Sequence, residues 1–123
     1  MPARLAHVLV FVADHARVAR FYQAVLGWPS ATRGGLTVIG PPGGGGVALH
    51  PVPPEVLAPR AADAPLVWRE DTALKPCFAV DDLAAARAAV DAHGGATREP
   101  WTWEGATHVD CADPEGNIFQ LVG

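Results

Sequence analysis

Tryptophan is the residue type in this chain whose number and spacing most directly suggest ligand chemistry. Four of the nine aromatic residues are tryptophans, and Trp101 and Trp103 are separated by one residue. Alternate residues of a strand face the same side, so both indole rings would share one surface. A flat ring with one N–H donor suits stacking on a planar ligand, and the alternative for each ring is the core or a subunit interface. Trp68 is placed to cover a ligand or to reach a second subunit.

The cysteines and the glycine run do not form a chemical motif. Cys77 and Cys111 stand far apart in the sequence without a CxxC pair, which fits neither a disulfide framework nor a zinc finger, so two buried thiols are expected. Residues 43–46 are four glycines. Because no Lys-Ser/Thr pair and no helix follow them, a mobile hairpin tip is expected there rather than a phosphate-binding loop.

Length and composition indicate one globular domain. The 123 residues are 50% hydrophobic and 18% charged, so the chain can bury a core. A net charge of −4 with no basic stripe argues against nucleic acid as a partner. The first apolar stretch, residues 5–13, is much shorter than the ~20 residues of a membrane span and runs into a helical pattern instead of a cleavage site. We therefore expect a cytoplasmic protein that does not bind membranes.

The first half of the sequence predicts a strand, a helix and three further strands. Residues 5–13 alternate in the manner of a strand that is covered on both faces. Asp14 is expected to cap a helix whose apolar residues recur at helical spacing until Gly27 ends it. The three strands are expected at residues 28–32, 35–39 and 46–52.

The second half repeats this order after a connector. Residues 51–76 contain six prolines and show no lasting periodicity. A strand is then expected at residues 77–80, with Asp81 as the cap of a helix over residues 83–93. Gly94 and Gly95 end that helix, and the last three strands are expected at residues 97–102, 105–111 and 117–122.

The two halves align at an offset of 67, which places Phe11 on Phe78 and Gly27 on Gly94. This repeat predicts an α+β fold of two βαβββ modules, residues 1–52 and 75–123, joined by a connector over residues 53–74. Each module alone is near the lower limit for a stable core, so two four-stranded sheets should associate with the helices outside and a curved cleft inside. The connector is long enough for the modules to pair within one chain or to exchange between two copies.

Residues 7–28, HVLVFVADHARVARFYQAVLGW, and residues 112–121, ADPEGNIFQL, flank a helix start at residues 80–83, VDDL. These stretches resemble the opening and closing signatures of the vicinal oxygen chelate superfamily, which includes glyoxalase I, bleomycin-resistance proteins and extradiol dioxygenases. The resemblance spans nearly the whole chain. It implies the glyoxalase/bleomycin resistance fold with a curved open-barrel cleft, and it implies a homodimer.

The resemblance also implies four metal-ligand positions. In the metalloenzymes of the superfamily, His, Glu or Gln side chains from four strands surround a divalent metal and leave open positions for substrate oxygens. The matching positions here are His7, Ala48, Lys75 (with Leu74 as the neighbouring choice) and Gln120, while His50 shares the face of Ala48 one residue pair further along. This set has at most two nitrogen ligands and no carboxylate, and the cationic Lys75 would repel the ion. No metal cofactor is therefore expected, with His7, His50 and Gln120 as a weak alternative site for Ni, Zn or Fe.

The favoured function is metal-free, non-catalytic binding of a small molecule, because the antibiotic-binding members of the superfamily lack the metal set and sequester a drug in a dimer. The acidic balance favours a neutral or cationic planar ligand. The expected ligand-binding residues are His7, Phe11, His50, Trp68, Trp101, Trp103, His108 and Gln120. One alternative is a metal-dependent lyase or dioxygenase that adds His108 or Glu104 to the weak metal set. The other is a metal-free enzyme with His7 or His108 as general base, which ranks last because no partner to orient the base is evident.

Overall fold

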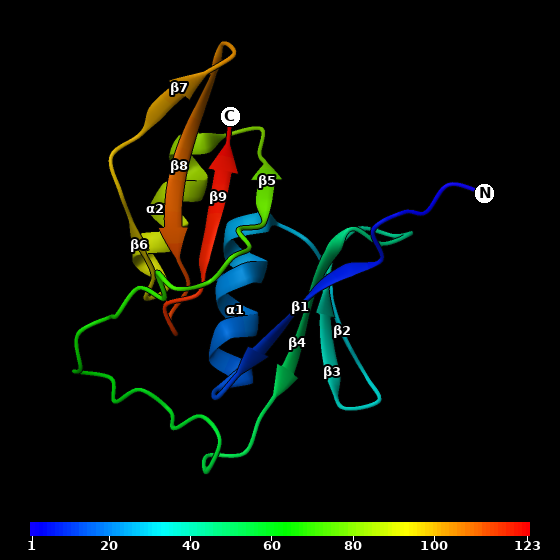
Figure 1. Cartoon of the computed structure of the whole chain (residues 1–123), viewed down its shortest axis with the longest axis vertical. Coiled ribbons are helices and arrows are strands. Elements are labelled where there is room, and N and C mark those ends of the chain that lie inside the picture. Colours follow the sequence, from blue (N-terminus) through cyan, green and yellow to red (C-terminus); the bar gives the residue numbers. More distant parts are fainter.

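Two halves with the same order of elements are joined by a long connector (Figure 1). In this computed structural model, which describes residues 1–123, the first half consists of β1 (His7–Val12), α1 (His15–Leu26), β2 (Ser30–Arg33), β3 (Leu36–Ile39) and β4 (Gly46–Pro51). The second half consists of β5 (Cys77–Ala79), α2 (Leu83–Ala92), β6 (Ala96–Thr97), β7 (Trp101–Trp103), β8 (Ala106–Ala112) and β9 (Ile118–Val122). The predicted α+β class is confirmed.

The strands form two separate sheets. Sheet 1 has the order β1-β4-β3-β2, and sheet 2 has the order β5-β9-β8-β6 with β7 also paired to β8. Sheet 2 therefore has five strands where four were expected, because the strand predicted over residues 97–102 is divided into β6 and β7. The division falls at residues 98–100, and Pro100 there has no N–H to donate to a ladder.

Each helix begins at an aspartate. Asp14 caps α1 as predicted by accepting a hydrogen bond from the backbone N–H of Arg17 at 3.2 Å, and Gly27 ends this helix with a φ of 69°. The cap of α2 is Asp82, which accepts from the N–H of Ala85 at 2.9 Å, so the prediction of Asp81 is wrong by one residue. The reason is that sheet pairing continues past β5, since the N–H of Val80 donates to Val122, and the helix starts correspondingly later.

The predicted alignment of Phe11 with Phe78 does not hold along the strands. Phe11 is 53% exposed on the face of sheet 1 opposite α1, whereas Phe78 is buried in the core. Because strand side chains alternate, a slip of one residue moves every side chain to the opposite face. An offset of 68 places Phe11 on Ala79 and Asp14 on Asp82, and it matches both the faces and the caps.

The core is shared by the two halves within one chain. Both helices lie on the same side of the strands, and α1 lies between the two sheets (Figure 1). The rings of Phe21 and Tyr22 on α1 contact Phe119 of β9, with centroids 5.8 and 5.6 Å apart, and Trp28 meets Phe78 at 5.9 Å. The first helix therefore packs against the sheet of the other half as well as against its own.

The sheet faces opposite the helices, here called the cleft faces, are only partly covered. On β1, Leu9 and Phe11 are exposed large apolar residues, so the prediction that this strand is covered on both faces is wrong. Helix α1 covers one face of sheet 1, and Leu9 on the other face lines a cavity together with Leu74 and Pro76 of the connecting segment. The cleft faces are where an apolar ligand or a second protein chain would make contact.

The connector and the glycine-rich loop are both fastened to the body of the molecule. Arg60 Nε donates to the carbonyl of Pro114 at 3.0 Å, and the N–H of Arg69 donates to the carbonyl of Gly116 at 2.9 Å. The glycine run forms the predicted loop between β3 and β4, and the N–H of Gly45 donates to the carbonyl of Ala6 at 2.7 Å. Neither helix has the length and apolarity that a bilayer crossing would require.

Candidate functional site

A chain of polar side chains crosses the cleft face of sheet 2, with Gln120 at its centre. Gln120 on β9 is only 5% exposed. Its Oε1 lies 2.8 Å from Nδ1 of His108, and its Nε2 donates to Oδ1 of Asp110 at 3.0 Å. The register explains the meeting, because His108 and Asp110 alternate along β8 and Asp110 pairs directly with Gln120.

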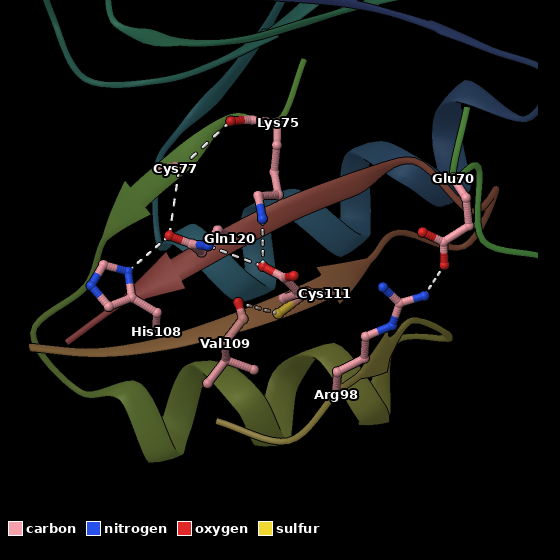
Figure 2. A network of polar contacts seen from close by, with 9 residues as sticks. Glu70, Lys75, Cys77, Arg98, His108, Val109, Cys111 and Gln120 are labelled. Carbon is pink, nitrogen blue, oxygen red and sulfur yellow. Dashed lines mark hydrogen bonds and ion pairs between the residues drawn. The ribbon is translucent and has the colours of Figure 1, made fainter. Parts of the chain in front are cut away.

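Lys75 and Cys77 extend this polar chain from the end of the connector and from β5. Lys75 Nζ donates to Asp110 Oδ1 at 3.0 Å, and the Cys77 thiol donates to Gln120 Oε1 at 3.6 Å (Figure 2). Burial by itself raises the pKa of Asp110, but the hydrogen bonds from Gln120 and Lys75 and the charges of Lys75 and Arg98 outweigh it, so this pKa lies below its ordinary value. Asp110 is therefore a carboxylate that only accepts hydrogen bonds.

Two indole rings border the polar chain. Trp101 lies parallel to the His108 ring, with centroids 4.5 Å apart and 14° between the planes, and Trp103 lies 5.8 Å from His108 at 60°. The expectation that both tryptophans share one face is confirmed by their pairing with His108 and Ala106, which are themselves two residues apart. Trp101 is 43% and Trp103 is 59% exposed, so both have ring surface free for a ligand.

The residues predicted on sheet 1 form a second group. Phe11 and His50 are opposite each other on β1 and β4, with ring centroids 5.3 Å apart. His7 lines a cavity of about 360 Å³ together with Arg33 and the glycine-rich loop. No hydrogen bond, ion pair or ring contact joins these residues to His108 or Gln120, and none of the four main cavities is lined by both groups.

Trp68 belongs to neither group. Its ring receives the guanidinium of Arg98, whose Cζ lies 4.0 Å from the ring centroid, and Arg98 also forms an ion pair with Glu70. One face of the Trp68 ring is therefore covered by a cation from the same chain.

The four positions implied for a metal do not fit one. Ala48 is buried and offers no donor atom, and Lys75 places an ammonium group beside Asp110. Both polar atoms of the Gln120 amide already have partners. Nowhere in the chain do three or more His, Cys, Asp or Glu residues gather in an arrangement that could hold a metal ion.

Sequence reasoning missed Asp110 and Cys77 as parts of the site. Cys77 was expected to be a buried thiol, and that expectation is correct only for Cys111, because Cys77 is exposed on the cleft face. Asp110 has the same strand parity as His108, which is the signal that would have found it. Its pairing with Gln120 depends on the β8–β9 register, which the sequence alone does not reveal.

The folded chain is similar to solved structures of one class. The chain is 23% identical to a glyoxalase/bleomycin resistance protein from Albidiferax ferrireducens, with a TM-score of 0.70 over 96% of each chain. A protein from the mobile metagenome of V. pseudocholerae is 26% identical, with a TM-score of 0.66 over 99% of this chain and 95% of that one. The fosfomycin resistance protein FosX from Mesorhizobium loti is 18% identical, with a TM-score of 0.69 over 99% and 92%. The fold is that of the glyoxalase/bleomycin resistance proteins.

The family assignment follows from the sequence match. The profile described as "Glyoxalase-like domain" covers residues 7–122, nearly the whole chain, so the protein belongs to the glyoxalase-like domain family. No functionally curated protein matches the sequence.

Proposed function

We propose that this protein binds a planar small molecule on the cleft face of sheet 2, without a metal and without chemical conversion. The supporting observation is that Trp101 and Trp103 are both half-exposed beside buried polar side chains of His108 and Gln120. A binding site of this type needs apolar ring surface for affinity and a few fixed polar atoms for orientation. Sequestration of an aromatic antibiotic or metabolite is the role we assign, in line with the resistance proteins among the structural neighbours.

Independence from metal is part of this proposal. The alternative, a lyase or dioxygenase that holds Ni, Zn or Fe with His7, His50 and Gln120, would require the Gln120 amide to leave His108 and Asp110. The polar contacts of sheet 2 therefore favour the metal-free function.

We further propose that the protein is a cytoplasmic homodimer in which sheet 1 of one copy faces sheet 2 of the other. Residues 1–52 carry four arginines against one acidic residue, whereas residues 53–123 carry four arginines and one lysine against twelve acidic residues. The halves thus have net charges of +3 and −7, which favours pairing of unlike halves. Exposed Leu9 and Phe11 on sheet 1 supply apolar area for this contact.

Elemental analysis and a binding titration test the proposal together. The protein is dialysed against Ni²⁺, Zn²⁺, Fe²⁺ and Mn²⁺ and then against metal-free buffer, and we expect clearly less than one metal ion per chain. Binding of 2-methoxynaphthalene, fosfomycin and bleomycin is then measured by calorimetry, with sedimentation velocity to determine the oligomeric state. Near-stoichiometric retained metal would instead favour the lyase or dioxygenase function.

Two variants locate the binding surface. Trp101→Leu should weaken binding of 2-methoxynaphthalene about 2- to 12-fold, because ring stacking contributes about 0.5–1.5 kcal/mol beyond area burial. Trp68→Leu is the matched control, since the ring of Trp68 is occupied by Arg98, and it should leave the affinity unchanged. Weaker binding by Trp68→Leu with unchanged binding by Trp101→Leu would show that the ligand binds at the connector instead.

A further inference from the structure

One buried polar atom of this chain has no hydrogen-bond partner. Among the buried side-chain nitrogen and oxygen atoms, only Nε2 of His108 lacks a partner, and His108 as a residue is 6% exposed. An unpaired buried polar atom destabilises a fold. Such an atom beside two half-exposed indole rings indicates a position where a ligand supplies the missing hydrogen bond.

The neighbours of His108 determine which kind of hydrogen bond is missing. The Asp110 carboxylate accepts only, so the Gln120 amide must direct its NH₂ group to Asp110 and its Oε1 to His108. An amide oxygen also accepts only, and the Cys77 thiol donates to the same oxygen. The His108 nitrogen that faces Gln120, Nδ1, must therefore carry the proton. In the neutral ring, Nε2 is then the unprotonated nitrogen, and its lone pair needs a donor.

This chain of contacts supplies a partner that orients the His108 ring, which was not evident from the sequence. Lys75 holds Asp110, Asp110 fixes the orientation of the Gln120 amide, and Gln120 fixes the tautomer of His108 (Figure 2). His108 is thus presented as an oriented acceptor rather than as a freely rotating ring. Carboxylate, ketone and ether groups have no hydrogen to give to Nε2, so they would leave the atom unpaired.

We propose that Nε2 of His108 accepts a hydrogen bond from a hydroxyl group on a planar conjugated ring, as in a phenol or an enol, whose ring stacks on Trp101 or Trp103. This inference rests on the proposed function, because it names the ligand class for the same site. His108 is bordered by β7, an edge strand of three residues that pairs only with β8 and ends in a hairpin at Glu104 and Gly105.

This assignment is tested with two probes, one of which carries a methyl group in place of the hydroxyl hydrogen of the other. 2-Naphthol and 2-methoxynaphthalene have the same ring system, but only 2-naphthol can donate. We expect the wild-type protein to bind 2-naphthol about tenfold more tightly by calorimetry, since an added hydrogen bond to a buried acceptor is worth roughly one decade of affinity. The His108→Phe variant should bind the two probes equally, whereas His93→Phe, at the exposed end of α2, should keep the tenfold difference.

A second measurement uses only the wild-type protein, so the test does not depend on whether the His108→Phe variant folds. In the ¹⁵N spectrum of the free wild-type protein, His108 should show a protonated Nδ1 and an unprotonated Nε2, and only 2-naphthol should shift the Nε2 signal. Equal affinity of the wild type for both probes, or a proton on Nε2, would overturn the hydrogen-bond assignment and leave metal-free binding of a planar ligand standing. Failure of both probes to bind would overturn the proposed function and this inference with it.

Discussion

The hydroxyl of Tyr22 donates a hydrogen bond to Asp113 at 2.9 Å, and this bond joins α1 of the first half to the turn before β9 in the second. Asp113 is fully buried and also accepts from the N–H groups of Glu115 and Asn117 and from the side-chain amide of Asn117. Burial raises the pKa of Asp113 although these donors act in the opposite direction. The turn therefore stabilises the packing of the two halves against each other, and this role does not depend on a ligand.

Tyr22→Phe should destabilise the protein without disturbing its packing. The variant keeps the ring that contacts Phe21 and Phe119 but removes one donor to a buried carboxyl group. The expected loss is about 1.5–3 kcal/mol in the free energy of unfolding, measured with urea. Ser30→Ala, which removes an exposed hydroxyl of β2, should change the free energy by less than about 0.5 kcal/mol. Similar values for the two variants would mean that the Tyr22 bond contributes nothing.

Cys111 should make the protein less stable in alkali. Burial raises the pKa of this thiol from 9.0 to about 12. Above pH 9 the thiol ionises in the unfolded chain while it stays protonated in the folded chain, so stability falls by about 1.4 kcal/mol per pH unit up to pH 12. Between pH 8 and pH 10, Cys111→Ala should therefore lose less stability than the wild type. Val109→Ala, which also truncates a buried side chain of β8, should keep the wild-type pH dependence, and a wild-type slope in Cys111→Ala would contradict this account.

Lys75→Met should destabilise the protein more at neutral pH than in acid. The pKa of Asp110 is lower in the folded chain than its ordinary value of 3.8. Its stabilising contribution is thus present above that value and is lost as the pH falls through the folded pKa. Removing Lys75 should cost about 0.5–1 kcal/mol at pH 6, because the pair is only partly buried, and progressively less as the pH falls below 3.8. In an Asp110→Asn background the same substitution should have no comparable effect.

Gly95→Ala should be strongly destabilising. An added Cβ would lie 2.4 Å from the carbonyl oxygen of Ala112, 2.7 Å from the ring of Phe21 and 2.9 Å from Val90. Backbone and core atoms of three elements would have to move, and overpacking of this kind costs about 1–3 kcal/mol or more. A thermal unfolding midpoint unchanged from the wild type would show that the residues packed around Gly95 can move apart to accommodate a methyl group.

The parts of the fold that could be predicted are those with local signals. The N-cap Asp14 and the C-terminal Gly27 determine α1 from short-range chemistry, and the turn at residues 113–116 follows from Asp-Pro and from Gly116, whose φ is 86°. The cap of α2 was misplaced because two aspartates are adjacent there. The length of the β5–β9 pairing decides between them, and that pairing is not local.

The candidate site was only half predictable for the same reason. The common face of Trp101 and Trp103 follows from alternation, and His108 and Gln120 were expected to bind a ligand. Their mutual contact depends on a register between β8 and β9 that no turn motif specifies by itself. The stacking of Trp101 on His108 likewise requires the β7 hairpin to be in position.

The unequal spacing of the helix signals shows how far the two halves have diverged from an exact repeat. The stretch from the cap Asp14 to Gly27 is one residue longer than the stretch from Asp82 to Gly94. One residue in a helix corresponds to a rotation of about 100°, so each half now requires its own helix to direct the following strands. A chimaera carrying two copies of the first half would lack Phe119, on which Phe21 and Tyr22 of α1 pack, so the halves are complementary parts rather than exchangeable ones.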